Sequence, residues 1–197
     1  MENTPIESLI QFLSRLPGLG PRSATRMVLF LLNKKQSHLE PLMDLMRQVD
    51  EKVIVCPVCG NLDTQSPCHL CQDTRRQKNV VCVVPQVADI WALERTRIYK
   101  GQYFVLGGLL SALDGIGPED LKISSLVEKI NQGGIEEVIL ALPLTVEGQT
   151  TLHYLADILK STSVKLSTLA HGVPVGGELD YLDEGTIQTA FTARREL

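Results

Sequence analysis

The stretch at residues 56–71, CPVCGNLDTQSPCHLC, decides how this part of the chain folds, because it holds two tight cysteine pairs. Two residues separate Cys56 from Cys59, and two separate Cys68 from Cys71, so the thiolates of each pair can turn toward one point. The segment between the pairs is rich in turn formers. This spacing predicts a four-cysteine zinc knuckle. Sulfur would fill all four positions around one zinc ion, so the metal should stabilise structure and not catalyse.

Two other interpretations of these cysteines stay open, namely two disulfides or four unrelated thiols. No apolar segment with a small-residue cleavage site opens the chain, so we expect a cytoplasmic protein, in which disulfides are disfavoured. His69 lies inside the second pair and could compete as a ligand, although four sulfurs suffice without it. Cys82 belongs to an apolar run, residues 80–84, which predicts a buried strand residue and not a fifth ligand.

Length and charge set broad limits on function. At 197 residues the chain has room for one domain and a smaller module, and no run of about twenty apolar residues predicts a membrane span. The net charge of −4 gives no overall sign of nucleic-acid binding. Residues 1–78, however, carry ten Lys and Arg against eight Asp and Glu, whereas residues 79–197 carry nine against fifteen. We therefore expect any polyanion contact in the first part, unless this imbalance is only solubilising surface.

The chain is predicted to begin with two helices. Thr4 can cap the first helix, Pro5 suits its first position, and Glu7 can complete a capping box. Apolar residues recur on one helical face until the sequence LPGLGP at 16–21 interrupts them. A second helix is predicted over about residues 22–32. Its inward-facing residues are expected to be Ala24, Val28, Leu31 and Leu32.

The junction of these helices resembles a helix-hairpin-helix module. Gly18 and Gly20 let the backbone approach a phosphate, and free N–H groups at the start of the second helix would point outward with its positive dipole end. Arg22 and Arg26 are four residues apart and share a face beside that turn. Such a module would hold the sugar-phosphate backbone and read no bases. The alternative is an ordinary helical hairpin with a glycine turn.

A third helix is predicted over about residues 38–52, with Leu42, Leu45, Met46 and Val49 as its apolar stripe. We expect the methionine to fill a core. A basic cluster, Arg75, Arg76 and Lys78, follows the cysteines and fits either a phosphate contact or a solvated loop.

The rest of the chain alternates between strands and helices. Strands are predicted at residues 80–84, 103–106, 138–142 and 164–169, and helices at 86–97, 119–131 and 147–160. This alternation predicts a mostly parallel sheet covered on both faces, with functional residues at the carboxyl ends of the strands.

Two kinds of chemistry lack support in this part of the sequence. Neither a Gly-x-x-x-x-Gly-Lys-Ser/Thr loop nor a Gly-x-Gly-x-x-Gly turn after the first strand is present, so nucleotide binding is not predicted. Ser111, His171 and Asp114 could form a catalytic triad on paper, but nothing in their spacing favours one over chance.

With these parts in this order, the chain resembles the RecR family of bacterial recombination mediators along essentially its whole length. The specific segments that carry the resemblance, besides the four cysteines with Arg75 and Arg76 after them, are LPGLGPRSA at 16–24, YFVLGG at 103–108, LDGIGP at 113–118, TVEG at 145–148 and AHGVPVGGEL at 170–179.

The resemblance implies an α/β fold with four parts. These are a helix-hairpin-helix module at 1–53, a zinc finger at 54–78, a Toprim-like domain at 79–172 with a mostly parallel sheet, and a C-terminal oligomerisation segment at 173–197. It also implies a ring-shaped oligomer, expected to be a homotetramer, around single- or double-stranded DNA in the nucleoid. Members of the family act with RecO, and in many bacteria RecF, to load RecA onto single-stranded DNA coated by single-strand-binding protein.

The family's DNA-contacting basic residues match Arg22 and Arg26 here, and its Toprim domain is the surface on which RecO docks. Two departures affect this domain. Pro85 stands where relatives often keep Glu after the first strand, and the acidic pair is reduced to Glu147 by Gln149. Leu142-Pro143-Leu144 also differs from the Asn-Pro that relatives often show there.

Because one carboxylate binds magnesium poorly, we expect no catalysis, and we assign Glu147 to partner binding or to a residual Toprim site. The alternatives are a metal-dependent Toprim enzyme with Glu147 as a magnesium ligand, and a zinc-bearing adaptor without DNA contact.

Overall fold

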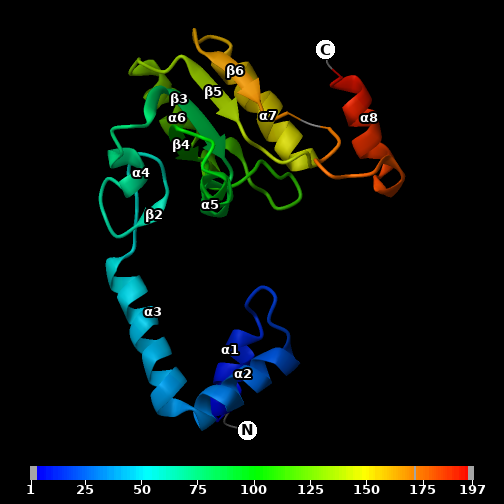
Figure 1. The fold of residues 1–197 in the computed structure, drawn as a ribbon. Coiled ribbons are helices and arrows are strands. Elements are labelled where there is room, and N and C mark those ends of the chain that lie inside the picture. The colour runs from blue at the N-terminus through cyan, green and yellow to red at the C-terminus, as the bar shows by residue number, and fades with distance from the viewer. Residues whose placement is uncertain (1–3, 171, 195–197) are drawn as a thin grey trace. The chain divides into compact units, whose positions relative to one another are not determined.

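The computed structural model of the chain describes residues 4–170 and 172–194 (Figure 1). Its internal contacts divide the chain into two compact units, residues 1–53 and 54–197.

The first unit is helical. Its elements are α1 (Pro5–Leu13), α2 (Pro21–Asn33), a π-helical turn (Lys35–Leu39) and α3 (Glu40–Lys52). The predicted capping box starts α1, since the Thr4 hydroxyl accepts the Glu7 N–H at 3.3 Å and the Glu7 carboxylate accepts the Thr4 N–H at 2.9 Å. Helices α1 and α2 pack against each other. The side chains that α2 buries are Ala24, Val28 and Leu31, as predicted, whereas Leu32 is only partly buried.

Helix α3 differs from expectation. The helix is present, but none of its side chains is buried. Met46 and Leu45 are 64% and 59% exposed, and Leu42 and Val49 also face solvent. The prediction that the methionine fills a core is therefore wrong within one copy of the chain. The predicted helix does carry its apolar residues on one face. Periodicity does not say, however, whether the surface that covers such a face belongs to the same chain.

The second unit begins with a small module and continues as an α/β sheet. The module contains β1 (Ile54–Val55), β2 (Leu62–Asp63) and α4 (His69–Gln72). The sheet and its helices are β3 (Gln77–Val84), α5 (Val87–Thr96), β4 (Gly101–Val105), α6 (Ile123–Asn131), β5 (Glu137–Leu140), α7 (Val146–Leu159) and β6 (Lys165–Thr168).

The four-stranded sheet has the order β4-β3-β5-β6, and all its pairs are parallel. The first connection leads from β3 to its neighbour β4, and the next returns past β3 to β5. The direction of winding thus reverses between β3 and β5, which is the place where parallel sheets of this kind form their sites. The predicted strand and helix alternation is confirmed, with ends shifted by a few residues. The largest shift is at α6, which begins only after a 3-10 turn at Pro118–Asp120.

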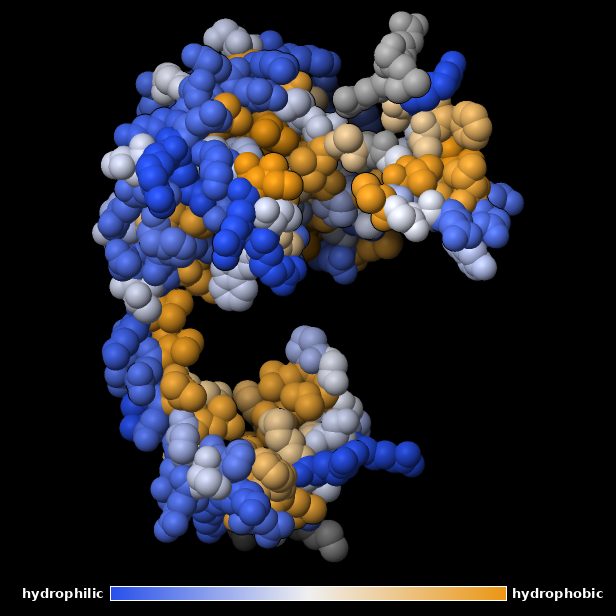
Figure 2. Space-filling model, in the orientation of Figure 1, coloured by the Kyte–Doolittle hydropathy of each residue, from blue (hydrophilic) through white to orange (hydrophobic). Residues whose placement is uncertain are grey.

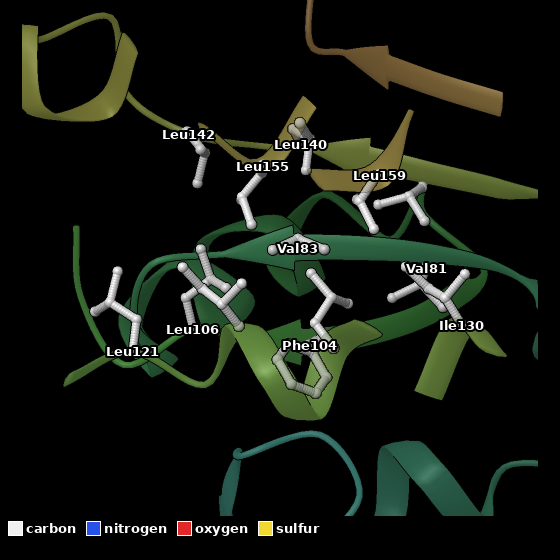
Figure 3. Close-up of a cluster of buried hydrophobic side chains, with 13 residues drawn as sticks. Val81, Val83, Phe104, Leu106, Leu121, Ile130, Leu140, Leu142, Leu155 and Leu159 are labelled. Atoms are coloured by element: carbon white, nitrogen blue, oxygen red, sulfur yellow. The ribbon is translucent and has the colours of Figure 1, made fainter. Parts of the chain in front are cut away.

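Alternate residues of the strands face two different layers. Val81 and Val83 of β3 join Phe104 of β4 in a cluster that α6 and α7 cover, with Leu155 and Leu159 as the α7 contribution (Figure 3). The intervening residues point to the opposite face, where α5 and the cysteine module pack on them. The strand residues of that second cluster are Cys82, Val84, Tyr103 and Val105. Cys82 is thus a buried strand residue, as predicted.

The last described segment adds little to the core. It contains a 3-10 turn at Leu179–Tyr181 and helix α8 (Glu184–Thr192), which the Asp183 carboxylate caps by accepting the Thr186 N–H at 2.9 Å. No side chain of α8 is buried, and Tyr181 and Phe191 are 82% and 68% exposed. None of the described helices combines the length and apolar character needed to cross a bilayer.

Candidate zinc centre and nucleic-acid interface

The four cysteines of the knuckle converge on one point. Their Sγ atoms all lie within 4.8 Å of one another, with Cys56 and Cys71 at 3.9 Å and Cys59 and Cys68 at 3.5 Å. A zinc ion with Zn–S bonds of about 2.3 Å sets the edges of a sulfur tetrahedron at about 3.8 Å. The separations therefore fit a ZnS₄ centre, and the cysteines are free thiols and not disulfides.

The protonation of this cluster also favours a cation. Hydrogen bonding from the Cys71 thiol lowers the pKa of Cys59 to about 5, and the same contact raises the pKa of Cys71. Burial raises the pKa of Cys68 to about 11. Four thiolates cannot share so small a volume without a positive charge among them. Bound zinc would supply that charge and displace the remaining protons.

The knuckle is fastened to the sheet by backbone contacts. The Val105 N–H at the end of β4 donates to the Cys59 carbonyl at 2.8 Å. Gly60 has φ +80°, and a Cβ there would lie 3.0 Å from the Val105 Cβ, so a glycine permits this close approach. Cys56, Cys59 and Cys68 belong to the same buried cluster as Val84 and Val105. The zinc centre is therefore part of the core of the second unit.

His69 is not oriented as a ligand. Its backbone N–H and its Nδ1 both contact the Asp63 Oδ2, at 2.8 and 2.6 Å. These contacts, the backbone hydrogen bond foremost, lower the pKa of Asp63 to about 2. The His69 ring thus braces the loop between the cysteine pairs and leaves the four sulfurs as the ligand set.

The glycine hairpin presents free donors at the start of α2. Gly18 adopts φ +78°, a conformation that glycine takes without strain, and no atom lies within 4 Å of where a Cβ of Gly18 or Gly20 would stand. No side chain in the described ranges caps α2. Within the described residues, the N–H groups of Arg22 and Ser23 have no acceptor, and the first helical bond runs from Ala24 to the Gly20 carbonyl. This geometry is suited to an anion, which the helix dipole would also favour.

Two guanidinium groups stand beside those donors. Arg22 and Arg26 are exposed and lie one turn apart on α2. Helix α2 contains no acidic residue, and neither arginine forms an ion pair in the described part of the chain. The four predicted hairpin residues, Gly18, Gly20, Arg22 and Arg26, thus lie together at the start of α2. The two arginines keep positive charges that no described carboxylate neutralises.

The basic cluster after the knuckle has a different role. The Arg76 side chain is only 9% exposed, pairs with the Glu94 carboxylate and donates to the Gly101 carbonyl at 3.1 Å. Tyr103 donates to the other Glu94 oxygen at 2.7 Å, and its ring lies 5.7 Å from the Arg76 guanidinium carbon. Arg75 pairs with Asp73. Of the two interpretations left open, a phosphate contact is therefore not supported for either arginine.

The α/β part of the second unit holds a cavity of about 470 Å³ at the point where the sheet winding reverses. Pro85 and Leu142 line it, and its one carboxylate belongs to Asp89, whose Oδ2 accepts the Gln86 N–H at 2.9 Å. Glu147 lies in the first turn of α7 and is not part of the lining. Among the described residues, the four cysteines are the single group of three or more potential metal ligands. One carboxylate in the cavity lining and Glu147 outside it do not make a magnesium site.

Of the conceivable catalytic triad, the structure describes Ser111 and Asp114. The Ser111 Oγ donates directly to the Asp114 Oδ2 at 2.7 Å and accepts the Asp114 N–H at 3.2 Å, so the pair closes a turn. His171 lies outside the described residues.

Some functional contacts were missed from the sequence. The Arg76–Glu94–Tyr103 network joins residues that are distant in sequence. The only sequence signal for it was that Arg76 directly precedes the strand β3. At Gly148, a Cβ would collide with the Pro143 carbonyl, so the helix start approaches the preceding loop closely.

Family models match this chain in four consecutive segments. They describe a RecR helix-hairpin-helix over residues 6–49, a RecR zinc finger domain with four cysteines over 53–73, a Toprim domain over 79–170 and a RecR C-terminal segment over 172–195. The chain is also 58% identical to Recombination protein RecR of Paramagnetospirillum magneticum over 99% of both chains. It is 56% identical to that of Rhizorhabdus wittichii and 54% identical to that of Sphingopyxis alaskensis, each over 99% of this chain and 98% of the relative.

The chain belongs to the RecR family. Membership assigns it to DNA recombination and repair, and these relatives are named as recombination proteins and not as enzymes. The zinc-finger match spans all four cysteines, and the sulfur cluster fits one structural zinc, so the predicted cofactor is confirmed. The predicted Toprim-like fold is confirmed as well.

Removing one zinc ligand should destabilise the second unit, and not the knuckle alone. We expect Cys59→Ser to lose zinc and to lower the unfolding midpoint by about 10 °C or more, since 1 kcal/mol corresponds to roughly 2–4 °C at this chain length. Metal analysis and thermal unfolding would measure both effects. Cys82→Ala is the matched control, because it removes a buried thiol from the same cluster and should keep the zinc. Full zinc content in Cys59→Ser would contradict the assignment.

Arg76 and Arg75 offer a second comparison. Arg76→Gln leaves the Glu94 carboxylate partly buried without its partner and should cost about 3 kcal/mol in denaturant unfolding. Arg75→Gln removes an exposed pair and should leave the stability nearly unchanged. If Arg76→Gln kept its stability but lost DNA affinity, the guanidinium would be a phosphate contact after all.

Proposed function

We propose that this protein is a non-catalytic recombination mediator that holds DNA through the start of α2. The carrying observation is the conjunction at the hairpin. At one helix end, two backbone N–H groups and two arginines, none with a partner among the described residues, lie beside an open glycine turn. Each feature alone is common, but together they satisfy the needs of a phosphate: close approach, directed donors and positive charge.

Binding through these groups is independent of sequence. Backbone amides and Arg22 and Arg26 would reach phosphate oxygens and not base edges, so single-stranded and double-stranded DNA both qualify as ligands. The affinity would depend steeply on salt, because each neutralised phosphate releases counterions. A protein of net charge −4 can bind DNA in this way when its unpaired cations are local.

We further propose a ring-shaped homo-oligomer, a tetramer by family resemblance, that encircles DNA. Support comes from apolar surface that one copy leaves uncovered (Figure 2). The α3 stripe is one such surface, and the segment around α8 is another, with Val175, Leu179, Tyr181 and Phe191 exposed. Two separate self-association surfaces on each copy are what a closed ring needs. We propose residues 173–197 as the assembly segment and keep 1–53, 54–78 and 79–172 as the other domains.

The partners follow from the family resemblance. We propose that the protein acts at the nucleoid with RecO, and with RecF where present, to help load RecA onto single-stranded DNA. The Toprim part is the proposed docking surface for RecO, with Glu147 in the first turn of α7 as a contact. The apolar cavity lined by Pro85 and Leu142 supports docking more than catalysis, since it lacks the carboxylates that magnesium chemistry needs.

The DNA contact can be tested with three variants. Arg22→Gln with Arg26→Gln should weaken binding by the same factor on unrelated sequences and reduce the salt slope by about one per arginine. Gly20→Ala fits its φ of −77° and open surroundings, so it should fold normally yet place a methyl group between backbone and phosphate. Fluorescence anisotropy over several salt concentrations would measure both. Arg47→Gln, on α3, is the control. Unchanged affinity in both α2 variants would contradict the proposed contact, and DNA turnover would contradict the mediator role.

Assembly can be tested on α3. Leu45→Lys puts a charge on the exposed stripe without touching a core, so it should lower the oligomeric state measured by light scattering. Glu51→Lys changes the opposite side of the same helix and should leave assembly intact. A monomeric wild-type protein, or a Leu45→Lys variant that assembles fully, would remove the basis for a ring.

A further inference from the structure

We propose that the outer face of α5 and the turn after it form a second nucleic-acid contact, one that stacks single-stranded bases on Trp91 and holds phosphates with Arg95 and Arg97. This inference rests on the proposed DNA-binding function, but it concerns a different unit of the chain and adds contact with bases, which the hairpin does not make.

Helix α5 has two clearly different faces. Ile90 is fully buried, and Val87 and Leu93 pack beside it against the sheet and the knuckle. The opposite stripe carries Trp91 and Arg95, one turn apart, with alanines at positions 88 and 92. Trp91 is 56% exposed although tryptophan is usually well covered. The small neighbours leave its ring accessible as a flat platform.

Exposed cations lie on α5, in the turn after it and at the starts of β3 and β4. Arg95, Arg97, Lys78 and Lys100 are exposed, and in the described part of the chain none of them forms an ion pair. The Gln77 N–H donates to the Lys100 carbonyl at 2.8 Å, so Lys78 and Lys100 both belong to the amino-terminal ends of the neighbouring strands β3 and β4.

The acidic groups nearby are already engaged. Glu94 faces inward to Arg76 and Tyr103, although Lys100 is near enough to act on it. Asp89 lies in the first turn of α5, and its carboxylate accepts the Gln86 N–H. Four other cations of this unit pair, as Arg75 does with Asp73, whereas Arg95 and Arg97 form no ion pair in the described part of the chain.

Arg97 adds an independent observation. It ends α5 in the left-handed region, with φ 57° and ψ 13°, and it is the one non-glycine residue with positive φ among those described. Glycine is the usual residue at such a helix end, because a side chain is strained there. An arginine at a position that glycine would occupy more comfortably points to use of its side chain.

A single-stranded nucleic acid fits this surface best. An exposed indole stacks on any base that is not already paired, and guanidinium groups bind the adjoining phosphates. Duplex DNA would offer the phosphates but hide the faces of its bases. A protein partner would need carboxylates for the same cations, and its binding would not depend on unpaired bases.

Trp91 is the sole tryptophan of the chain, so its fluorescence reports on this surface directly. We expect a thymidine oligonucleotide to quench the emission of the full-length protein. An abasic oligonucleotide with the same number of phosphates should bind more weakly and leave the emission nearly unchanged. Trp91→Leu should weaken binding of the thymidine strand by at least about fivefold, whereas Tyr154→Leu, at another exposed aromatic residue, should not.

Arg97→Gly separates a contact from a structural role. Glycine relieves the backbone strain, so the unfolding midpoint should stay or rise while the affinity falls and the salt slope decreases by about 0.7. Arg75→Gln removes an exposed charge elsewhere and should leave the affinity unchanged. An Arg97→Gly variant with wild-type affinity and slope would overturn the role of this residue.

The same titration distinguishes the two proposals. If DNA binds but the emission does not change, or if abasic and thymidine strands quench it equally, the α5 contact is wrong and the hairpin contact stands. If quenching persists at low salt in the Arg22→Gln and Arg26→Gln variant, the α5 contact is supported independently. If only a protein and no oligonucleotide changes the emission, the surface is a protein-docking site and the inference is overturned. Absence of all DNA binding would overturn both proposals.

Discussion

The attraction between one cation and four sulfur atoms governs the second unit of this protein. The knuckle has few apolar side chains of its own, yet its cysteines form part of the layer that covers Cys82, Val84, Tyr103 and Val105 of the sheet. Because both faces of a parallel sheet must be covered, the metal does more than shape a loop. It holds in place the part of this layer that α5 does not cover.

The cations of this chain divide by whether they are paired. Arg76 forms an ion pair with Glu94 of α5 and donates to the Gly101 carbonyl of β4. These contacts connect the segment after the knuckle to α5 and β4. Arg22 and Arg26 on α2, and Arg95 and Arg97 at the end of α5, have no such partners in the described residues. For a protein with net negative charge, the pairing of individual side chains is therefore a better guide to polyanion binding than the total.

Much of this fold could be predicted because its signals are local. Capping at Thr4, the cysteine spacing and the apolar runs of the strands each act over a few residues. The pairing of Arg76 with Glu94 could not, since it depends on how α5 packs over the sheet. The prediction that Leu45 and Met46 are covered was wrong within one copy for a related reason. Amphipathic spacing predicts a covered face but does not identify the surface that covers it. The departures at Pro85 and Gln149 needed no structure, because a carboxylate that is missing from the expected acidic set is visible in the sequence itself.

The helical unit cannot account for its own stability. Among its described residues only Ala24, Val28 and Leu31 are buried, while α3 exposes a whole apolar stripe. So small a core does not offset the entropy of ordering about fifty residues. On the proposed assembly, a second copy supplies the missing cover, and the hairpin that contacts DNA becomes rigid only in the oligomer. DNA binding and assembly would then favour each other, because both require the helical unit to be folded. This coupling needs no change from one folded conformation to another.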